Sequence, residues 1–129
     1  MIFIDTGAWF ARFVPDDLAH TQVAKWFSAN RDVMVTSDFC VDETLTLLVA
    51  RKRPRLAVEA GHALFSESLA RLYFLTRQIH RSWILFQQRA AAGGSFTDRT
   101  SKILIDDLEV QTALALDEHF NQFGVSVFP

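Results

Sequence analysis

The chain has 129 residues, of which 50% are hydrophobic and 22% charged, and this length and composition suit one globular domain over residues 1–129. The formal net charge of -2 at pH 7 excludes a generally basic nucleic-acid-binding surface, so a polyanionic partner would have to meet a local basic patch or a metal ion. A lone cysteine excludes an internal disulfide. No apolar run approaches the roughly 18 residues of a membrane span, and Asp5 and Arg12 interrupt any signal-peptide pattern. We therefore expect a cytoplasmic protein.

Short apolar runs alternate with helical patterns along the whole chain. The runs that predict buried strands are residues 2–4, 33–36, 72–76 and 112–116, and a short edge strand is expected at 125–128. Strands that alternate with helices predict βαβ units with right-handed crossovers, and therefore a parallel sheet. We find no linker, internal repeat or low-complexity segment that would divide the chain.

Helical spacing of apolar residues fills the intervals between these strands. A turn at 6–8 leads into a helical stretch. Asp16 and Asp17 after Pro15 indicate a helix start, and either Ser37 or Asp38 is a suitable N-cap for the next helix. Further helices are expected from about 54 to 68, from 79 to 90, around 103–105 and over 118–123. The helix that begins at Ile79 carries a clean amphipathic stripe and is ended by two glycines.

Two acids stand directly after predicted strands, Asp5 after the first and Asp117 after the fourth. Parallel strands deliver both to one edge of the sheet, the edge where open α/β sheets build their sites. Glu43 lies early in the helix after the second strand, and Asp98 opens the buried helix. Helices that follow parallel strands begin at the same edge, and the Gly93-Gly94 turn can bring the helix of Asp98 back to it, so we expect the four carboxylates to converge there.

Converging carboxylates repel one another unless a cation lies between them. Oxygen ligands without His or Cys suit Mg²⁺ or Mn²⁺ rather than Zn²⁺, and such an ion lowers the pKa of a bound water and stabilises a leaving oxygen. The acids therefore indicate hydrolytic phosphoryl transfer. Each acid taken alone is also compatible with a helix cap or a loop, and Asp38, Asp42, Asp106 and Asp107 are assigned to caps and solvated faces.

Four segments, in chain order, resemble the signature segments of the PIN-domain nucleases, and among these the VapC-type toxins of bacterial toxin–antitoxin pairs. The segments are Ile4-Asp5-Thr6, Val41-Asp42-Glu43-Thr44-Leu45, Ser95-Phe96-Thr97-Asp98-Arg99-Thr100-Ser101 and Ala113-Leu114-Ala115-Leu116-Asp117-Glu118-His119-Phe120. The resemblance spans the whole chain. It implies a three-layer α/β/α PIN-like domain with a central parallel sheet of four to five strands, and a Mg²⁺- or Mn²⁺-dependent endoribonuclease that acts as a toxin.

The resemblance also implies site residues and partners. It carries the family's acidic quartet, as catalytic residues and metal ligands, onto Asp5, Glu43, Asp98 and Asp117. The first and third acids are the surest metal contacts and the fourth is the least constant. Thr6 and Thr100 match supporting hydroxyl residues, whereas Arg99 and Lys102 fall where the family varies and take no role from it. An RNA substrate, a homodimer and a cognate antitoxin whose tail covers the site are further implications.

Other polar and aromatic residues have plainer interpretations. The basic run Arg51-Lys52-Arg53-Pro54-Arg55 suits an RNA backbone or an acidic protein partner, but also a solvated turn between helices. The histidines share no ligand spacing, and only His119 is close to the proposed site. Cys40 is expected to be a small buried residue. The core, rather than a surface that stacks bases, is expected to contain Trp9, Phe10, Phe13, Phe39 and Trp83.

Two alternative functions stay open on the residues alone. The first is an acidic-pocket phosphatase or a phospho-receiver-like protein. Against the phosphatase, Gly7 stands where a haloacid-type phosphatase has its second Asp. Against the receiver domain, Thr76 ends the third strand where a receiver domain has an Asp. The second is a catalytically inactive PIN-like module that binds RNA or protein.

Overall fold

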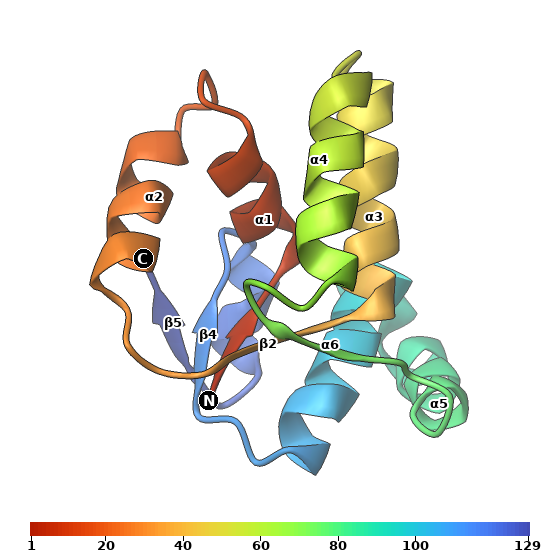
Figure 1. Cartoon of the computed structure of the whole chain (residues 1–129). Coiled ribbons are helices and arrows are strands. Elements are labelled where there is room, and N and C mark those ends of the chain that lie inside the picture. Colours follow the sequence, from red (N-terminus) through yellow and green to blue (C-terminus); the bar gives the residue numbers. More distant parts are fainter.

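Five short strands form one parallel sheet at the centre of the molecule (Figure 1). The structure, a computed structural model, describes all 129 residues. The strands are β1 (Ile2–Ile4), β2 (Met34–Ser37), β3 (Arg71–Tyr73), β4 (Thr112–Leu114) and β5 (Ser126–Phe128), in the order β3-β2-β1-β4-β5. Every neighbouring pair is parallel, and Phe3 of β1 lies opposite Val35 on one side and Ala113 on the other. The predicted parallel sheet of four to five strands is confirmed, with five.

Six α-helices and two short 3-10 turns connect the strands. They are α1 (Thr6–Phe13), α2 (His20–Ala29), α3 (Asp38–Ala50), α4 (Pro54–Phe65), α5 (Ile79–Arg89), η1 (Ala90–Ala92), α6 (Phe96–Asp107) and η2 (Glu118–Gln122). None of these helices is both long and apolar enough to cross a bilayer.

Helices cover both faces of the sheet because side chains alternate along β1. Phe3 faces α6 and η2 and packs in one core with Leu104 and Phe120. Ile4 faces the opposite way, into a second core that it shares with Trp9 of α1 and with residues of α2 and α4. The result is the expected three-layer α/β/α arrangement, and it leaves the carboxyl ends of the central strands open between the layers.

Helices α3 and α4 form an antiparallel pair that extends beyond the sheet (Figure 1). The basic run of residues 51–55 forms the turn between them and the start of α4. Arg53 pairs with Asp16 of the α1–α2 loop at 2.5 Å, and the Arg51 guanidinium lies 5.9 Å from the ring centre of Phe10. Part of this basic run therefore contacts the chain itself, as a turn between helices would.

Among the sequence-predicted boundaries that the structure contradicts are the start of α2 and the bounds of β3. The helix expected to start at Asp16 and Asp17 begins only at His20, because Asp17 Oδ2 accepts the Ala19 backbone N–H at 3.0 Å and closes a turn between α1 and α2. The third strand was expected over 72–76 but spans Arg71–Tyr73. As an edge strand it pairs with β2 alone, and the Leu75 N–H is taken by Asp38 Oδ1 at 3.1 Å rather than by another strand.

The helix α5 is where the sequence predicted, but its apolar stripe is not buried. Trp83 is 46% and Ile79 37% exposed, whereas Ser82 is fully buried and its hydroxyl donates to the Gln78 carbonyl. The helix packs mainly on α6 at the margin of the molecule rather than on the sheet, so only a narrow face is covered. Trp83 is therefore not a core residue, in contrast to the fully buried Trp9.

Candidate active site

Asp5 lies at the end of β1, in the centre of the sheet. Only 4% of the residue is exposed, and its position before α1 carries no capping duty, because its side chain makes no cap hydrogen bond. The Cys40 thiol of α3 donates to Asp5 Oδ1 at 3.8 Å, while the second oxygen, Oδ2, receives no hydrogen bond from the protein. A buried strand thus delivers a carboxylate with one free oxygen.

Asp98 enters the site from the first turn of α6. It forms a capping box with Ser95: the Asp98 N–H donates to Ser95 Oγ at 3.0 Å, and the Ser95 N–H donates to Asp98 Oδ2 at 2.9 Å. This reciprocal pair fixes both the helix start and the carboxylate. Asp98 Oδ1 has no hydrogen bond from the protein, so this aspartate also keeps one oxygen free.

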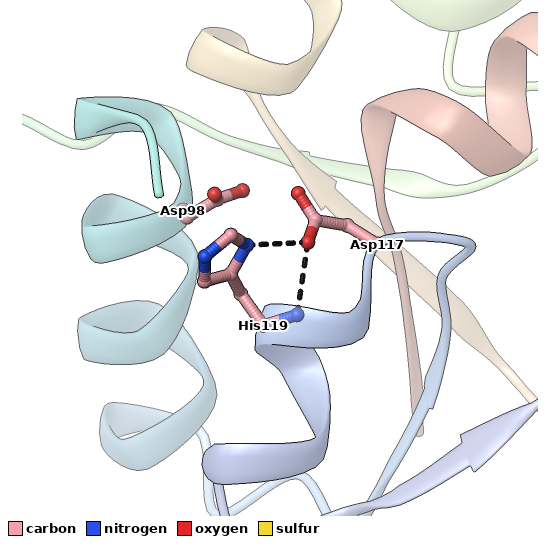
Figure 2. A group of neighbouring side chains, drawn as sticks. All are labelled: Asp98, Asp117 and His119. Carbon is pink, nitrogen blue, oxygen red and sulfur yellow. Dashed lines mark hydrogen bonds and ion pairs between the residues drawn. The ribbon is translucent and has the colours of Figure 1, made fainter. Parts of the chain in front are cut away.

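Asp117 was expected directly after the fourth strand, but β4 ends at Leu114 and Asp117 instead caps η2. Its Oδ1 accepts the backbone N–H of His119 at 2.9 Å and lies 2.6 Å from His119 Nδ1 (Figure 2). One donor atom each from Asp98, Asp117 and His119 can be chosen so that all lie within 4.8 Å of one another. Figure 2 shows the two carboxylates pointing toward each other, from α6 and from the loop before η2.

Glu43 completes the acidic group from α3. Its side chain is half-buried and makes no hydrogen bond or ion pair within the chain. Its negative charge repels the other acids and contributes to the raised pKa of both Asp5 and Asp98. The structure therefore brings all four predicted acids to one edge of the sheet, and their role as metal ligands stays a prediction.

The electrostatics of this group favour a bound cation. Burial raises the pKa of Asp5 from 3.8 to about 7, and repulsion from Asp98, Glu43 and Asp117 adds to that rise. Burial, followed by the charges of Asp117 and Glu43, also raises the pKa of Asp98. A divalent cation would remove this repulsion and restore the ionised forms. The oxygen donors fit Mg²⁺ or Mn²⁺, and the imidazole of His119 adds a nitrogen that Mn²⁺ also accepts.

The two predicted supporting threonines differ in their surroundings. Thr6 Oγ1 is buried beside the site and has no hydrogen-bond partner in the structure. Thr100 is fully buried, and its hydroxyl donates to the Thr97 carbonyl of its own helix at 2.6 Å rather than to an acid. Thr6 is therefore free to bond a ligand or an acid, whereas Thr100 serves the first turn of α6.

Sequence reasoning missed the groups that surround the acids. Cys40 Sγ lies between Asp5 Oδ1 at 3.8 Å and Ser101 Oγ at 3.6 Å, and burial and the charge of Asp5 raise the pKa of the thiol to about 12. Gly94 packs so closely that an added Cβ would lie 3.3 Å from Asp98 Oδ2. The signal for Cys40 was available, because it lies in the first turn of a helix that begins at the same sheet edge.

No family model matches the chain. The curated proteins that it resembles include the 23S rRNA-specific endonuclease VapC20 of Mycobacterium tuberculosis, in the CDC 1551 and H37Rv strains. Each is 30% identical over 125 residues, which cover 96% of this chain and 95% of the relative. Among solved structures, the crystal structure of M. tuberculosis VapC20, described as a sarcin–ricin loop cleaving toxin, matches with a TM-score of 0.89 and 28% identity. That match covers 97% of this chain and 96% of VapC20.

Proposed function

The chain belongs to the VapC family of PIN-domain toxin endonucleases, as its four segments predicted, and we propose that it cleaves 23S rRNA at the sarcin–ricin loop with a divalent cation held by its acidic group. Family membership makes the chain an endoribonuclease. The rRNA target is that of the similar proteins, which align with this chain along nearly its whole length. An rRNA substrate implies action in the cytoplasm.

One observation carries the proposal of a metal centre. Each of the three aspartates has one carboxylate oxygen that the protein holds and one that receives no hydrogen bond from the protein. Cys40 holds Asp5, the Ser95 amide holds Asp98, and His119 holds Asp117. The carboxylates are thus fixed in direction while their second oxygens stay available to a cation.

The chain's own residues would hold and orient the reacting groups. A bound Mg²⁺ or Mn²⁺ would supply a Lewis acid that lowers the pKa of a water and neutralises charge on the phosphate oxygens. Asp5, with a pKa of about 7 before the cation arrives, would give up its proton as the cation binds. Glu43, the one member without a hydrogen bond to the protein, can shift its side chain to meet either the cation or the attacking water.

Cleavage of RNA by matched variants tests this function. Wild-type protein should cut the sarcin–ricin loop of 23S rRNA in Mn²⁺ or Mg²⁺ and not in EDTA. Asp98→Asn should lose cleavage by on the order of a hundredfold or more and should bind Mn²⁺ more weakly by calorimetry. Asp42→Asn, one residue from Glu43 on α3 and exposed, makes the same charge change and should keep both properties.

Normal cleavage by a well-folded Asp98→Asn protein would contradict the assignment of the site. Wild-type protein that neither binds Mn²⁺ at millimolar concentration nor cuts RNA would instead favour the inactive binding module.

The family also supplies the proposed protein partners. A homodimer and a cognate antitoxin would bury apolar surface that the chain exposes, and one such surface is a groove between α3 and α4. This groove has a volume of about 690 Å³ and includes the exposed Val49, Val58 and Phe65. Light scattering of the purified protein, alone and with the product of the neighbouring gene, tests both partners. A monomer that does not bind that product would argue against them.

A further inference from the structure

A polar cavity lies beside the acidic group, on the same side of the sheet as α6. Its volume is about 230 Å³, and it lies between the end of α5, α6 and η2. Its polar lining comes from Arg89, Arg99, Lys102 and Gln122, with Leu85 and Phe123 as apolar neighbours. No acidic residue lines it. Three cations around one small cavity indicate an anion site.

Arg99 is the least solvated of these cations. Only 5% of the residue is exposed, and its Nη2 donates to the Gly93 carbonyl and, at 3.4 Å, to the Arg89 carbonyl. No carboxylate lies within ion-pairing distance of it, and its buried Nε has no hydrogen-bond partner. A buried charge without a counter-charge is costly, and an anion in the adjoining cavity would offset that cost.

The other two cations differ in how far the chain already neutralises them. Arg89 is exposed at the edge of the cavity and forms no ion pair. Lys102 donates to Asp106 Oδ1 at 2.8 Å and to the Phe123 carbonyl at 3.3 Å. Arg89 and Arg99 therefore carry the uncompensated positive charge, and Arg89 is the one that solvent and a ligand can reach.

Two glycines separate this cavity from the acids. Gly93 and Gly94 have φ values of +82° and +87° and present no side chain. A Cβ on Gly94 would lie 3.2 Å from Arg99 Nη2 and 3.3 Å from Asp98 Oδ2, so one small residue stands between the guanidinium and the carboxylate. Because no side chain stands between the two sites, a nucleic acid strand can pass over the glycines and place one phosphate at the acids and a neighbouring phosphate at the cations.

We infer that the cavity between α5, α6 and η2 binds a backbone phosphate of the RNA substrate next to the one that is cleaved, with Arg89 and Arg99 as its phosphate-binding residues. This inference rests on the proposed function. Such a contact positions the strand and carries no sequence information, because a phosphate is the same at every nucleotide. It would act on substrate binding rather than on the chemical step.

The salt dependence of RNA binding tests the site. The probe is a labelled hairpin with the sarcin–ricin loop sequence, and the proteins carry Asp5→Asn so that the probe stays intact. Adding Arg89→Gln should lower the slope of log Kd against log salt concentration by about 0.7 to 0.9, the effect of one lost phosphate contact. Lys25→Gln removes the same charge from an exposed, unpaired side chain on α2, across the sheet, and should leave the slope unchanged.

Kinetics of the otherwise wild-type enzyme provide a second measurement. Arg89→Gln should raise KM for the hairpin several-fold with kcat nearly unchanged, because the contact is the same in the ground state and the transition state. Arg99→Gln should act in the same direction, and circular dichroism establishes whether it folds.

Three results would overturn the inference. If the wild type cuts the hairpin but the Arg89→Gln slope equals that of the Lys25→Gln control, the phosphate site is wrong and the nuclease function stands. If Arg89→Gln weakens binding of inorganic phosphate but not of the hairpin, the cavity binds a free anion instead. If the wild type does not cut the hairpin in Mn²⁺, the proposed function is wrong, and the inferred binding site for an RNA phosphate is wrong with it.

Discussion

His119 Nδ1 lies 2.6 Å from Asp117 Oδ1, and the same oxygen accepts the His119 backbone N–H at 2.9 Å (Figure 2). His119 therefore contacts the Asp117 carboxylate with both its ring and its backbone N–H. With a carboxylate as its partner, Nδ1 carries the ring proton, which leaves Nε2 as an acceptor in the neutral ring.

This contact predicts the effect of His119→Ala. Loss of the ring should let the Asp117 carboxylate rotate, and we expect Mn²⁺ binding to weaken by about 10- to 100-fold, as for other residues that orient a metal ligand. Isothermal calorimetry measures the change. His80→Ala, at an exposed position of α5 without a hydrogen bond, is the control and should bind Mn²⁺ like the wild type. Equal affinities of the two variants would contradict the prediction.

Gly94→Ala should damage the site as well as the fold. The positive φ of +87° is unfavourable for alanine, and the new Cβ would press on Arg99, Asp98 and His119 at 3.2 to 3.4 Å. Gly124 has a φ of +74° but no atom within 4 Å of its Cβ position, so Gly124→Ala isolates the backbone effect. We expect both variants to lose roughly 1 kcal/mol of unfolding free energy, measured in urea. Only Gly94→Ala should also weaken Mn²⁺ binding. Unaltered Mn²⁺ binding by Gly94→Ala would contradict this prediction.

The raised pKa of Asp5 predicts how stability depends on pH in metal-free protein. Between its unfolded value of 3.8 and its folded value of about 7, the native state holds a proton that the unfolded chain has lost. The free energy of unfolding should therefore fall as pH rises through this range, by on the order of 4 kcal/mol. Burial of Asp98, whose pKa is also raised, contributes in the same direction.

Urea unfolding in EDTA at pH 4 and pH 8 measures this dependence. Asp5→Asn should flatten most of it, and Asp42→Asn should not, because Asp42 is exposed. Mn²⁺ should restore stability to the wild type at pH 8, since a ligand that binds only the native state stabilises it. A wild-type stability that does not change with pH would show that Asp5 ionises normally.

Cys40 should be inert in the native protein. It is fully buried, and its pKa of about 12 keeps the thiol protonated, so almost no thiolate is available. We expect no reaction with a thiol reagent at pH 8 until urea unfolds the chain, when one equivalent reacts. Rapid reaction of the native protein would mean that α3 opens beside Asp5.

Much of the site followed from the sequence because the chain alternates strands and helices. Right-handed crossovers put the residues after parallel strands at one edge, so Asp5 and Glu43 could be placed together from the sequence, and the Gly93-Gly94 turn could bring Asp98 back to that edge. The helix starts at Ser37 and Ser95 rest on local caps that the sequence also contains. The failures came where a local signal was overridden, as at Asp17, whose side chain closes a turn instead of opening a helix.

The sequence by itself determined the family, the parallel sheet and the four acids, since each depends on residue type and order. Only the tertiary structure decided which oxygen of each aspartate is free, that His119 and Cys40 hold two of them, and that Arg99 is buried without a carboxylate partner. The contact of Cys40 with Asp5 and Ser101 joins residues far apart in the chain, whereas that of His119 with Asp117 depends on how the short turn before η2 folds. The direction of a side chain and the burial of a charge are properties of packing, and periodicity along one segment carries no information about them.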